Sequence, residues 1–338
     1  MRIFKRKLYD KLLEWKNNRH GKTAVLIEGA RRVGKSTLTK QFAENEYESY
    51  VMIDFSIVRD DVLELFNHID DLDYFFLQLQ FRLGVSLKER KSLVIFDEVQ
   101  KCPKARQAIK HLVADGRYDY IETGSLISIK KNVKDILIPS EEEKLFLYPM
   151  DYEEFKWALG DNTAIPQLRM LFDKKLSIGD AVTRKLMRDF RIYMVVGGMP
   201  QAVDTYIDTN NLMEVDRVKR NIIQLYDDDF YKIDSSGRLS MLFDAIPAQL
   251  NSNASRYQVA SAIGSNTNSE KVLQLISELR ESMTINMAYH ANDPGVGMSL
   301  VMNLNKYKMY IGDTGLFITL AFKDKDFTEN IIYQKMMS

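Results

Sequence analysis

The chain has 338 residues, of which 28% are charged and 45% are hydrophobic, and its 47 Lys and Arg residues balance its 47 Asp and Glu residues. This balance excludes a disordered polyelectrolyte and a protein whose whole surface is a basic nucleic-acid mat, although a local basic patch stays open. The single cysteine, Cys102, excludes an internal disulfide framework and a zinc site with two or more thiolates.

The first 150 residues alternate between short apolar runs and helical patterns. Phe4, Leu8, Leu12 and Trp15 share one face of a predicted N-terminal helix. Strands are expected at 23–28, 50–54, 92–97, 118–123 and 144–148, and helices at 35–43, 60–90 and 104–114. This alternation predicts an α/β fold of the P-loop NTPase, AAA+-like type, in which a parallel sheet carries helices on both faces.

The pattern changes after Pro149, and residues 151–250 are expected to be helical. Helices at 240–250, 256–263 and 269–282, followed by strands at 284–289 and 308–311, predict a winged-helix module. We therefore expect four segments. They are an ATPase core over 1–150, an all-α lid over 151–238, a winged-helix-like part over 239–322, and over 323–338 the start of a C-terminal segment that continues beyond this chain.

The chain carries no feature that directs it to a membrane. No apolar run approaches the roughly 20 residues that a membrane-spanning helix needs. The basic N-terminus lacks the apolar block of a secretory signal. We expect a cytoplasmic protein.

The clearest motif is a phosphate-binding loop. The segment from Gly29 to Ser36 fits Gly-x4-Gly-Lys-Ser, and it follows a predicted strand and opens a predicted helix. Backbone N–H groups of such a loop surround phosphate, Lys35 reaches the β and γ phosphates, and the Ser36 hydroxyl ligates Mg²⁺. The expected nucleotide-binding residues in this segment are Gly29, Ala30, Arg31, Arg32, Val33, Gly34, Lys35, Ser36 and Thr37.

A second motif, an apolar strand that ends in two acids, follows 62 residues after the lysine. Leu93–Phe96 precede Asp97 and Glu98. Asp97 is expected to hold Mg²⁺ through water, and Glu98 to orient and activate the attacking water. On its own, the pair could be solvated acids at a strand end, but the upstream phosphate loop favours the catalytic interpretation.

The fourth predicted strand ends with Thr123 and, two residues on, Ser125. Ligands of open parallel sheets sit at the carboxyl edge, where both hydroxyls could contact the γ-phosphate or the water. An ordinary turn is an equally good interpretation. The chain has no Asn-Lys-x-Asp motif to recognise guanine, so ATP is the expected nucleotide.

Together, GARRVGKST, IFDEVQ with Pro103, the TGS strand end and GGMPQAV resemble the AAA+/STAND-related ATPases of the AAA_14 type with a C-terminal DUF4143 region. The resemblance runs from about residue 20 to the segment 311–316. It implies an ATPase core, a helical lid and a winged helix, and it assigns Gly198 and Pro200 to a lid element that touches the adenine side of the nucleotide.

The chain also departs from the family. Longer relatives end in a nuclease-like domain that this chain does not reach. Relatives commonly carry a Gly-Arg pair before the fifth strand, and residues 138–144 lack it, which puts activation by a neighbour's arginine in doubt. Arg31, Arg32 and Arg117 are the arginines expected near the site.

Two other functions stay open beside a Mg²⁺-dependent ATPase that drives a conformational change in an unidentified partner. One is an ATP-controlled DNA-binding protein. It is not favoured, because the predicted recognition helix carries three acids against Lys271 and Arg280. The other is a nucleotide-state switch with little turnover. The oligomeric state is not indicated.

Overall fold

The computed structural model describes residues 2–124, 141–252, 254–265, 268–292, 295 and 302–323. Their contacts divide the chain into two units. The sheet unit is Lys5–Leu147, and the helical unit combines Tyr148–Ser338 with Met1–Phe4. The finer boundaries expected at 238 and 322 stay predictions.

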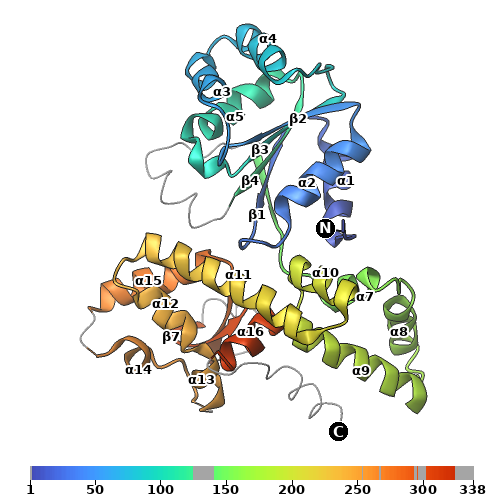
Figure 1. Ribbon diagram of the computed structural model, residues 1–338, viewed down its shortest axis with the longest axis vertical. Helices are drawn as coiled ribbons and strands as arrows, with labels where there is room; N and C mark the ends of the chain where they lie inside the picture. The colour runs from blue at the N-terminus through green and yellow to red at the C-terminus, as the bar shows by residue number, and fades with distance from the viewer. Residues whose placement is uncertain are drawn as a thin grey trace. The chain divides into compact units, whose positions relative to one another are not determined.

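The sheet unit is built on five parallel strands in the order β2-β3-β4-β1-β5 (Figure 1). They are β1 (Ala24–Glu28), β2 (Ser49–Asp54), β3 (Ser92–Asp97), β4 (Asp119–Gly124) and β5 (Glu142–Phe146). Because β4 pairs with both β1 and β3, the carboxyl ends of these three strands lie next to one another. The predicted α/β fold with a parallel sheet is confirmed.

Helices cover both faces of this sheet, as predicted (Figure 1). Two of them, α1 (Lys7–Arg19) and α2 (Lys35–Glu46), lie on one face. The other face carries α3 (Asp60–Leu65), η1 (Phe66–His68), α4 (Leu72–Leu83), η2 (Val99–Lys101) and α5 (Pro103–Asp115).

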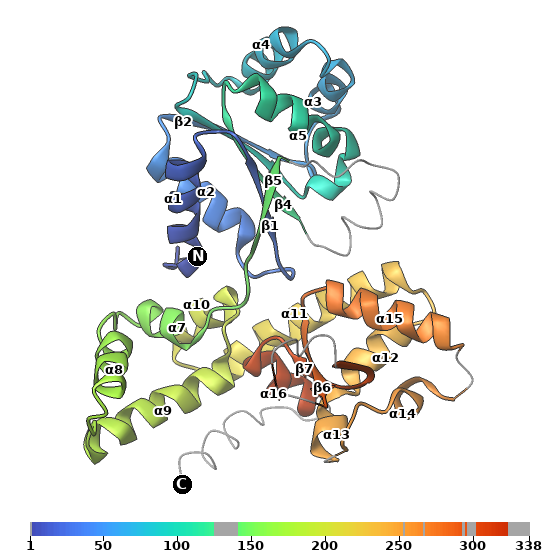
Figure 2. The same ribbon diagram turned by 180° about the vertical axis from the view of Figure 1, so that it is seen from behind.

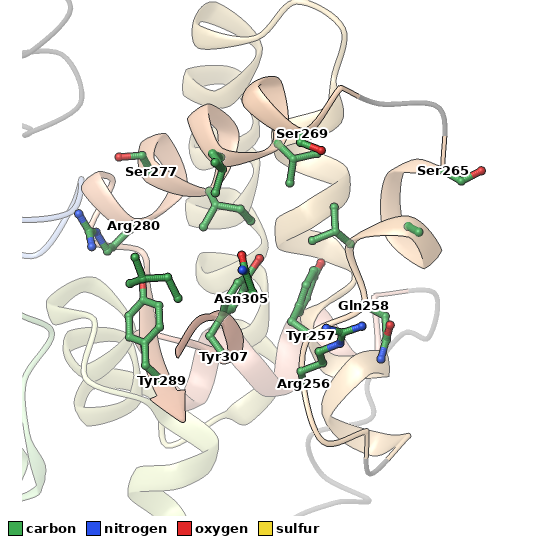
Figure 3. A pocket seen from close by; sticks show the side chains of 17 residues that line it. Arg256, Tyr257, Gln258, Ser265, Ser269, Ser277, Arg280, Tyr289, Asn305 and Tyr307 are labelled. Atoms are coloured by element: carbon green, nitrogen blue, oxygen red, sulfur yellow. The ribbon is translucent and has the colours of Figure 1, made fainter. Parts of the chain in front are cut away.

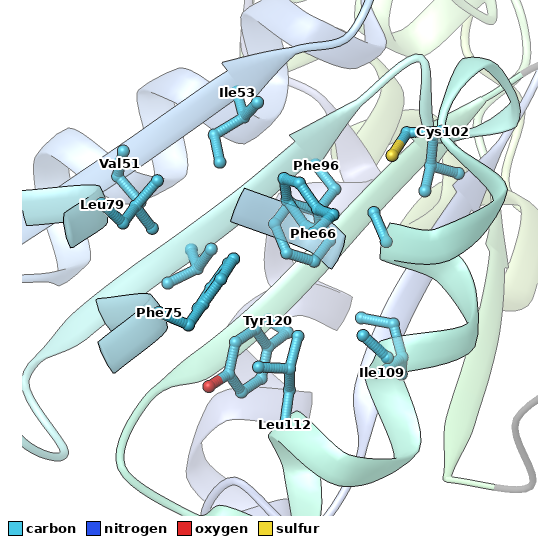
Figure 4. Packing of buried hydrophobic residues seen from close by; sticks show 14 of the residues in the cluster. Val51, Ile53, Phe66, Phe75, Leu79, Phe96, Cys102, Ile109, Leu112 and Tyr120 are labelled. Atoms are coloured by element: carbon cyan, nitrogen blue, oxygen red, sulfur yellow. The ribbon is translucent and has the colours of Figure 1, made fainter. Parts of the chain in front are cut away.

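An aromatic cluster fixes α3, η1 and α4 on the sheet (Figure 4). The Phe66 ring lies edge-on to the rings of Phe75 and Phe96, with centroids 5.2 and 5.7 Å apart. Such pairs each add about 0.5–1.5 kcal/mol beyond simple burial. The helical pattern expected over 60–90 is confirmed as far as Leu83, but it forms separate helices that are divided between Leu65 and Leu72. It stops short of residue 90, because Gly84 takes a left-handed φ of 64° and ends α4.

The helical unit contains ten helices in its described residues. They are α7 (Tyr152–Ala158), α8 (Ala164–Asp173), α9 (Asp180–Val196), α10 (Pro200–Thr209), α11 (Leu212–Ile233), α12 (Arg238–Asp244), α13 (Ile246–Asn251), α14 (Val259–Ile263), α15 (Ser269–Glu281) and α16 (Thr314–Ala321). Antiparallel strands β6 (Ile285–Ala291) and β7 (Met302–Ile311) lie between α15 and α16 (Figure 2).

Two details of the helical unit differ from the sequence expectation. The helix expected over 240–250 is two helices, because Pro247 in the first turn of α13 starts a new helix. The helix α16 was not expected. It begins at Thr314, and the side chain of the preceding residue, Asp313, accepts a hydrogen bond from the Leu316 N–H. The C-terminal segment expected over 323–338 lies, beyond Lys323, outside the described residues. Within the described ranges, no helix is both long and apolar enough to cross a bilayer.

Candidate nucleotide-binding site

The loop between β1 and α2 has the backbone that a phosphate-binding loop requires. Gly34, directly before α2, has a φ of 97°, which a residue with a side chain rarely adopts. A Cβ on Gly29 would clash with the Leu147 carbonyl, at the end of β5. Gly34 therefore supplies a left-handed backbone conformation, and Gly29 leaves room for the Leu147 backbone.

Lys35 is buried in this loop. Its ammonium donates to the Gly29 and Ala30 carbonyls at 2.9 and 3.0 Å. Burial lowers the pKa of Lys35, while the charges of Glu98 and Asp97 oppose that shift. The lysine thus lies within the electrostatic field of both predicted acids.

Asp97, at the end of β3, joins the loop to the neighbouring strand. Its Oδ1 atom accepts a hydrogen bond from the Ser36 hydroxyl at 2.9 Å and another from the Thr123 hydroxyl of β4. The strand order explains why Thr123 reaches Asp97, because β4 lies directly beside β3, between β3 and β1. A hydroxyl and a carboxylate that converge in this way fit Mg²⁺, which prefers oxygen ligands.

Glu98 follows in a strained backbone conformation, with a φ of 54°. Its N–H lies 3.4 Å from the Thr123 hydroxyl oxygen, and its carboxylate accepts a hydrogen bond from the side-chain amide of Gln100. Sequence reasoning missed Gln100. The available signal was an amide two residues after a candidate catalytic acid.

The N-terminus supplies a second contact that sequence reasoning missed. The guanidinium of Arg6, one residue before α1, donates to the Val33 carbonyl at 2.9 Å. Arg6 is buried. The residues that precede α1 therefore brace the phosphate loop from outside the motif.

The remaining sequence candidates fall in different places. Thr37 lies in the first turn of α2, beside Ser36. Ser125 lies outside the described residues. The expectation that Arg117 lies near the site is wrong: it precedes the amino end of β4, at the sheet edge opposite Thr123, and pairs with Asp115 and Asp73 at 2.7 and 2.8 Å.

Gly198 and Pro200 belong to the helical unit, where Gly198 is enclosed by protein backbone. Its carbonyl accepts the Met150 N–H at 2.7 Å, its N–H donates to Asp313, and a Cβ would clash with the Met150 carbonyl. Pro200 starts α10. We call Met150, Gly197, Gly198, Asp313 and Gly315 the glycine joint. The assignment of Gly198 and Pro200 to a nucleotide stays a prediction.

Two buried ionisable side chains, Asp313 and Lys219, form hydrogen bonds in the glycine joint. Burial raises the pKa of the Asp313 carboxyl, although backbone N–H groups and Lys219 favour its charged form. The Lys219 ammonium donates to the Val195 and Gly315 carbonyls at 2.9 and 3.3 Å. The joint thereby ties the end of α9 to the start of α16.

A separate cavity of about 550 Å³ lies in the C-terminal part of the helical unit. Figure 3 shows Tyr257, Tyr289 and Tyr307 on the side of the cavity opposite α15. Arg256 and Arg280 also line it. Along α15, three acids outnumber two bases, so the charge of this helix does not favour DNA.

Family models match two parts of the sequence, one of which covers most of the sheet unit. Residues 21–156 match the family AAA_14, described as an AAA domain. Residues 187–326 match DUF8612, a domain of unknown function, and the resemblance to DUF4143 is not confirmed. No curated protein matches the sequence.

Among solved structures, the Walker-type ATPase PABY2304 of Pyrococcus abyssi is 16% identical, over 94% of this chain and 96% of that chain, with a TM-score of 0.56. This likeness shows a shared fold. The Orc1 protein of Aeropyrum pernix in complex with DNA (10% identity, 98% and 95% covered, TM-score 0.32) and AMPPCP-bound DnaA of Aquifex aeolicus (12%, 82% and 88%, 0.35) are too distant to bear on function.

Proposed function

We propose that the AAA domain of this chain binds ATP with Mg²⁺ and hydrolyses it. One observation carries the proposal: side chains from the loop and from two further strands meet at one sheet edge. These are Lys35, Ser36, Asp97, Glu98 and Thr123. A loop that binds phosphate, a pair of oxygen ligands and a spare carboxylate are the parts that ATP hydrolysis requires.

Each group has a distinct task in this proposal. Lys35 leaves its loop carbonyls to neutralise the β and γ phosphates, assisted by the N–H groups at the start of α2. Ser36 and Asp97 would hold Mg²⁺, which supplies charge neutralisation at the phosphates when bound. Glu98 accepts the proton of the attacking water, and Gln100 restrains its carboxylate.

Thr123 is proposed as a positioning residue. Its hydroxyl contacts both Asp97 and the backbone N–H of Glu98, so it holds the end of β3 in register with β4. Ser125 is proposed to reach the γ-phosphate or the water, as its place after the strand suggests. Both roles depend on where the uncharged hydroxyl groups of Thr123 and Ser125 lie.

We further propose that hydrolysis drives a conformational change that acts on a partner protein. Leu147 donates to the Glu28 carbonyl at 2.8 Å and touches Gly29 of the phosphate loop. Three residues later, Met150 belongs to the glycine joint. A movement of the phosphate loop can therefore pass along this short stretch of chain to the helical unit. We propose that Gly198 and Pro200 move in response.

The experiment measures ATP affinity and phosphate release by the purified chain, beside Lys35→Ala. Lys40→Ala is the matched control, because Lys40 is an exposed lysine of the same helix. We expect Lys35→Ala to lose ATP binding by at least about 100-fold, while Lys40→Ala matches wild type. Equal binding by all three proteins would refute the proposed site. Binding without phosphate release would instead support a switch with little turnover.

A further inference from the structure

The hairpin formed by α8 and α9 as far as Arg191 exposes an apolar surface that the described residues of its own unit do not cover. In α8, none of the ten residues is buried, and α9 buries only its last two, Val195 and Val196. The large apolar side chains Met170, Phe172 and Leu176 are 58%, 81% and 57% exposed. Large apolar side chains gathered on an exposed surface mark a site that can bind a partner. Figure 1 shows the hairpin at the outer end of its unit.

A second exposed apolar surface lies on α4 in the sheet unit. Its inner face packs in the core, whereas Tyr74, Leu77 and Phe81 follow at helical spacing on the outer face and are 43%, 65% and 84% exposed. Ile57, 81% exposed, belongs to a loop that reaches the end of α4, since Arg59 donates to the Arg82 carbonyl at 3.5 Å.

The two surfaces have opposite charge. The segment 57–83, which contains the α4 surface, carries six acids and two bases, a net charge of −4. The hairpin, residues 164–191, carries seven bases and three acids, a net charge of +4. Asp60, Glu64 and Asp70 beside the α4 surface are exposed, and so are most of the lysines and arginines of the hairpin, so the two surfaces attract each other.

We propose that the α8–α9 hairpin of one copy docks on the α4 surface of a second copy. Apolar side chains would supply the burial, and the opposite charges would steer and orient the encounter. The interface is head-to-tail, so a pair of copies keeps one free hairpin and one free α4 surface, and further copies add until the assembly closes into a ring or extends. This inference does not depend on ATP hydrolysis.

The test measures the mass of the full chain by sedimentation velocity from about 1 to 100 µM, at low and high salt. Phe172→Asp disrupts the hairpin, Phe81→Asp disrupts α4, and Leu273→Asp, at a 62% exposed leucine of α15, is the control. We expect wild type and the control to associate alike, more weakly at high salt. Each disrupting variant should raise the dissociation constant at least about tenfold.

A mixture of the two variants makes the test specific. A Phe172→Asp copy keeps its α4 surface and a Phe81→Asp copy keeps its hairpin, so an equimolar mixture should recover one interface and form a heterodimer. Circular dichroism checks that each variant is folded, and Leu176→Asp or Leu77→Asp replaces a variant that is not.

Three results would overturn the proposal. The first is a wild type that stays monomeric both with and without Mg-ATP. The second is a mixture that fails to recover association, which would indicate hairpin-to-hairpin or other pairing. The third is a monomer that binds anionic lipid vesicles or duplex DNA through Phe172, which would assign the basic apolar hairpin to those surfaces.

Discussion

The phosphate loop and the glycine joint are both glycine-containing turns beside a helix start, but their surroundings differ. In the phosphate loop, charged and hydroxyl side chains from separate strands meet beside the turn. In the glycine joint, the Met150 backbone fills the space beside Gly198, and the Asp313 carboxylate fills the space beside Gly197. The phosphate loop has polar and charged side chains around it that suit a charged ligand. In the glycine joint, the glycines have no side chain, and this allows neighbouring segments to pack closely.

This difference shows that the role of a glycine-containing turn depends on the residues that surround it. The resemblance to known ATPases assigns Gly198 to the nucleotide, whereas the structure describes contacts of Gly198 within its own unit. Both roles are compatible if the joint responds to the loop through Leu147 and Met150. The following predictions separate packing from chemistry.

The largest effect is expected from Gly198→Ala, which places a methyl group on the Met150 carbonyl. We expect a loss of at least about 3 kcal/mol in the unfolding free energy of the helical unit, because backbone must move. Gly160→Ala is the control: its φ is 84°, but no atom of the described residues lies within 4 Å of the added Cβ, so a loss of about 1 kcal/mol is expected. Urea unfolding measures both. Equal losses would show that the joint is not tightly packed.

A smaller effect is expected at Thr123, in the polar turn. Thr123→Val keeps the shape but removes the hydroxyl between Asp97 and Glu98, and we expect kcat to fall about tenfold while ATP affinity changes little. Thr123→Ser should restore most of the rate, because it restores the hydroxyl. A Thr123→Val protein with wild-type kcat would remove Thr123 from the account.

The smallest effect concerns the acid of the glycine joint. Burial raises the pKa of Asp313 in the folded chain, so the folded chain holds this proton more firmly than the unfolded chain. The stability that Asp313 contributes is therefore present at low pH and is lost as pH rises through the folded pKa. Asp313→Asn cannot titrate. The stability advantage of wild type over this variant should shrink from pH 4 toward neutral pH, as followed by chemical unfolding, and a growing advantage would contradict the assigned direction.

The sequence predicted the parts of the molecule that depend on local chemistry. The loop from Gly29 to Ser36 and the acids at the end of β3 follow from motifs within a few residues of each other, and the alternation of strands and helices follows from apolar periodicity. The strand order brings Thr123 to Asp97, as its place at the carboxyl edge suggested.

The rest depends on contacts between distant residues. Gly198 meets Asp313 across 115 positions, and Arg6 meets Val33 across 27, so neither contact has a local pattern. Arg117 was misplaced because a residue's distance along the chain from Thr123 does not show which sheet edge it occupies. The break before α4 was missed because the apolar spacing continues across Phe66 to Leu72, although the backbone does not.

The most direct test of the central claim is steady-state phosphate release from Mg-ATP by wild type and Glu98→Gln, with ATP affinity measured for both. Glu44→Gln, at an exposed acid on α2, is the control. The account predicts that wild type and the control release phosphate, and that Glu98→Gln binds ATP normally but releases phosphate at least about 100-fold more slowly. Unchanged release by Glu98→Gln would contradict the assignment of Glu98 as the catalytic base.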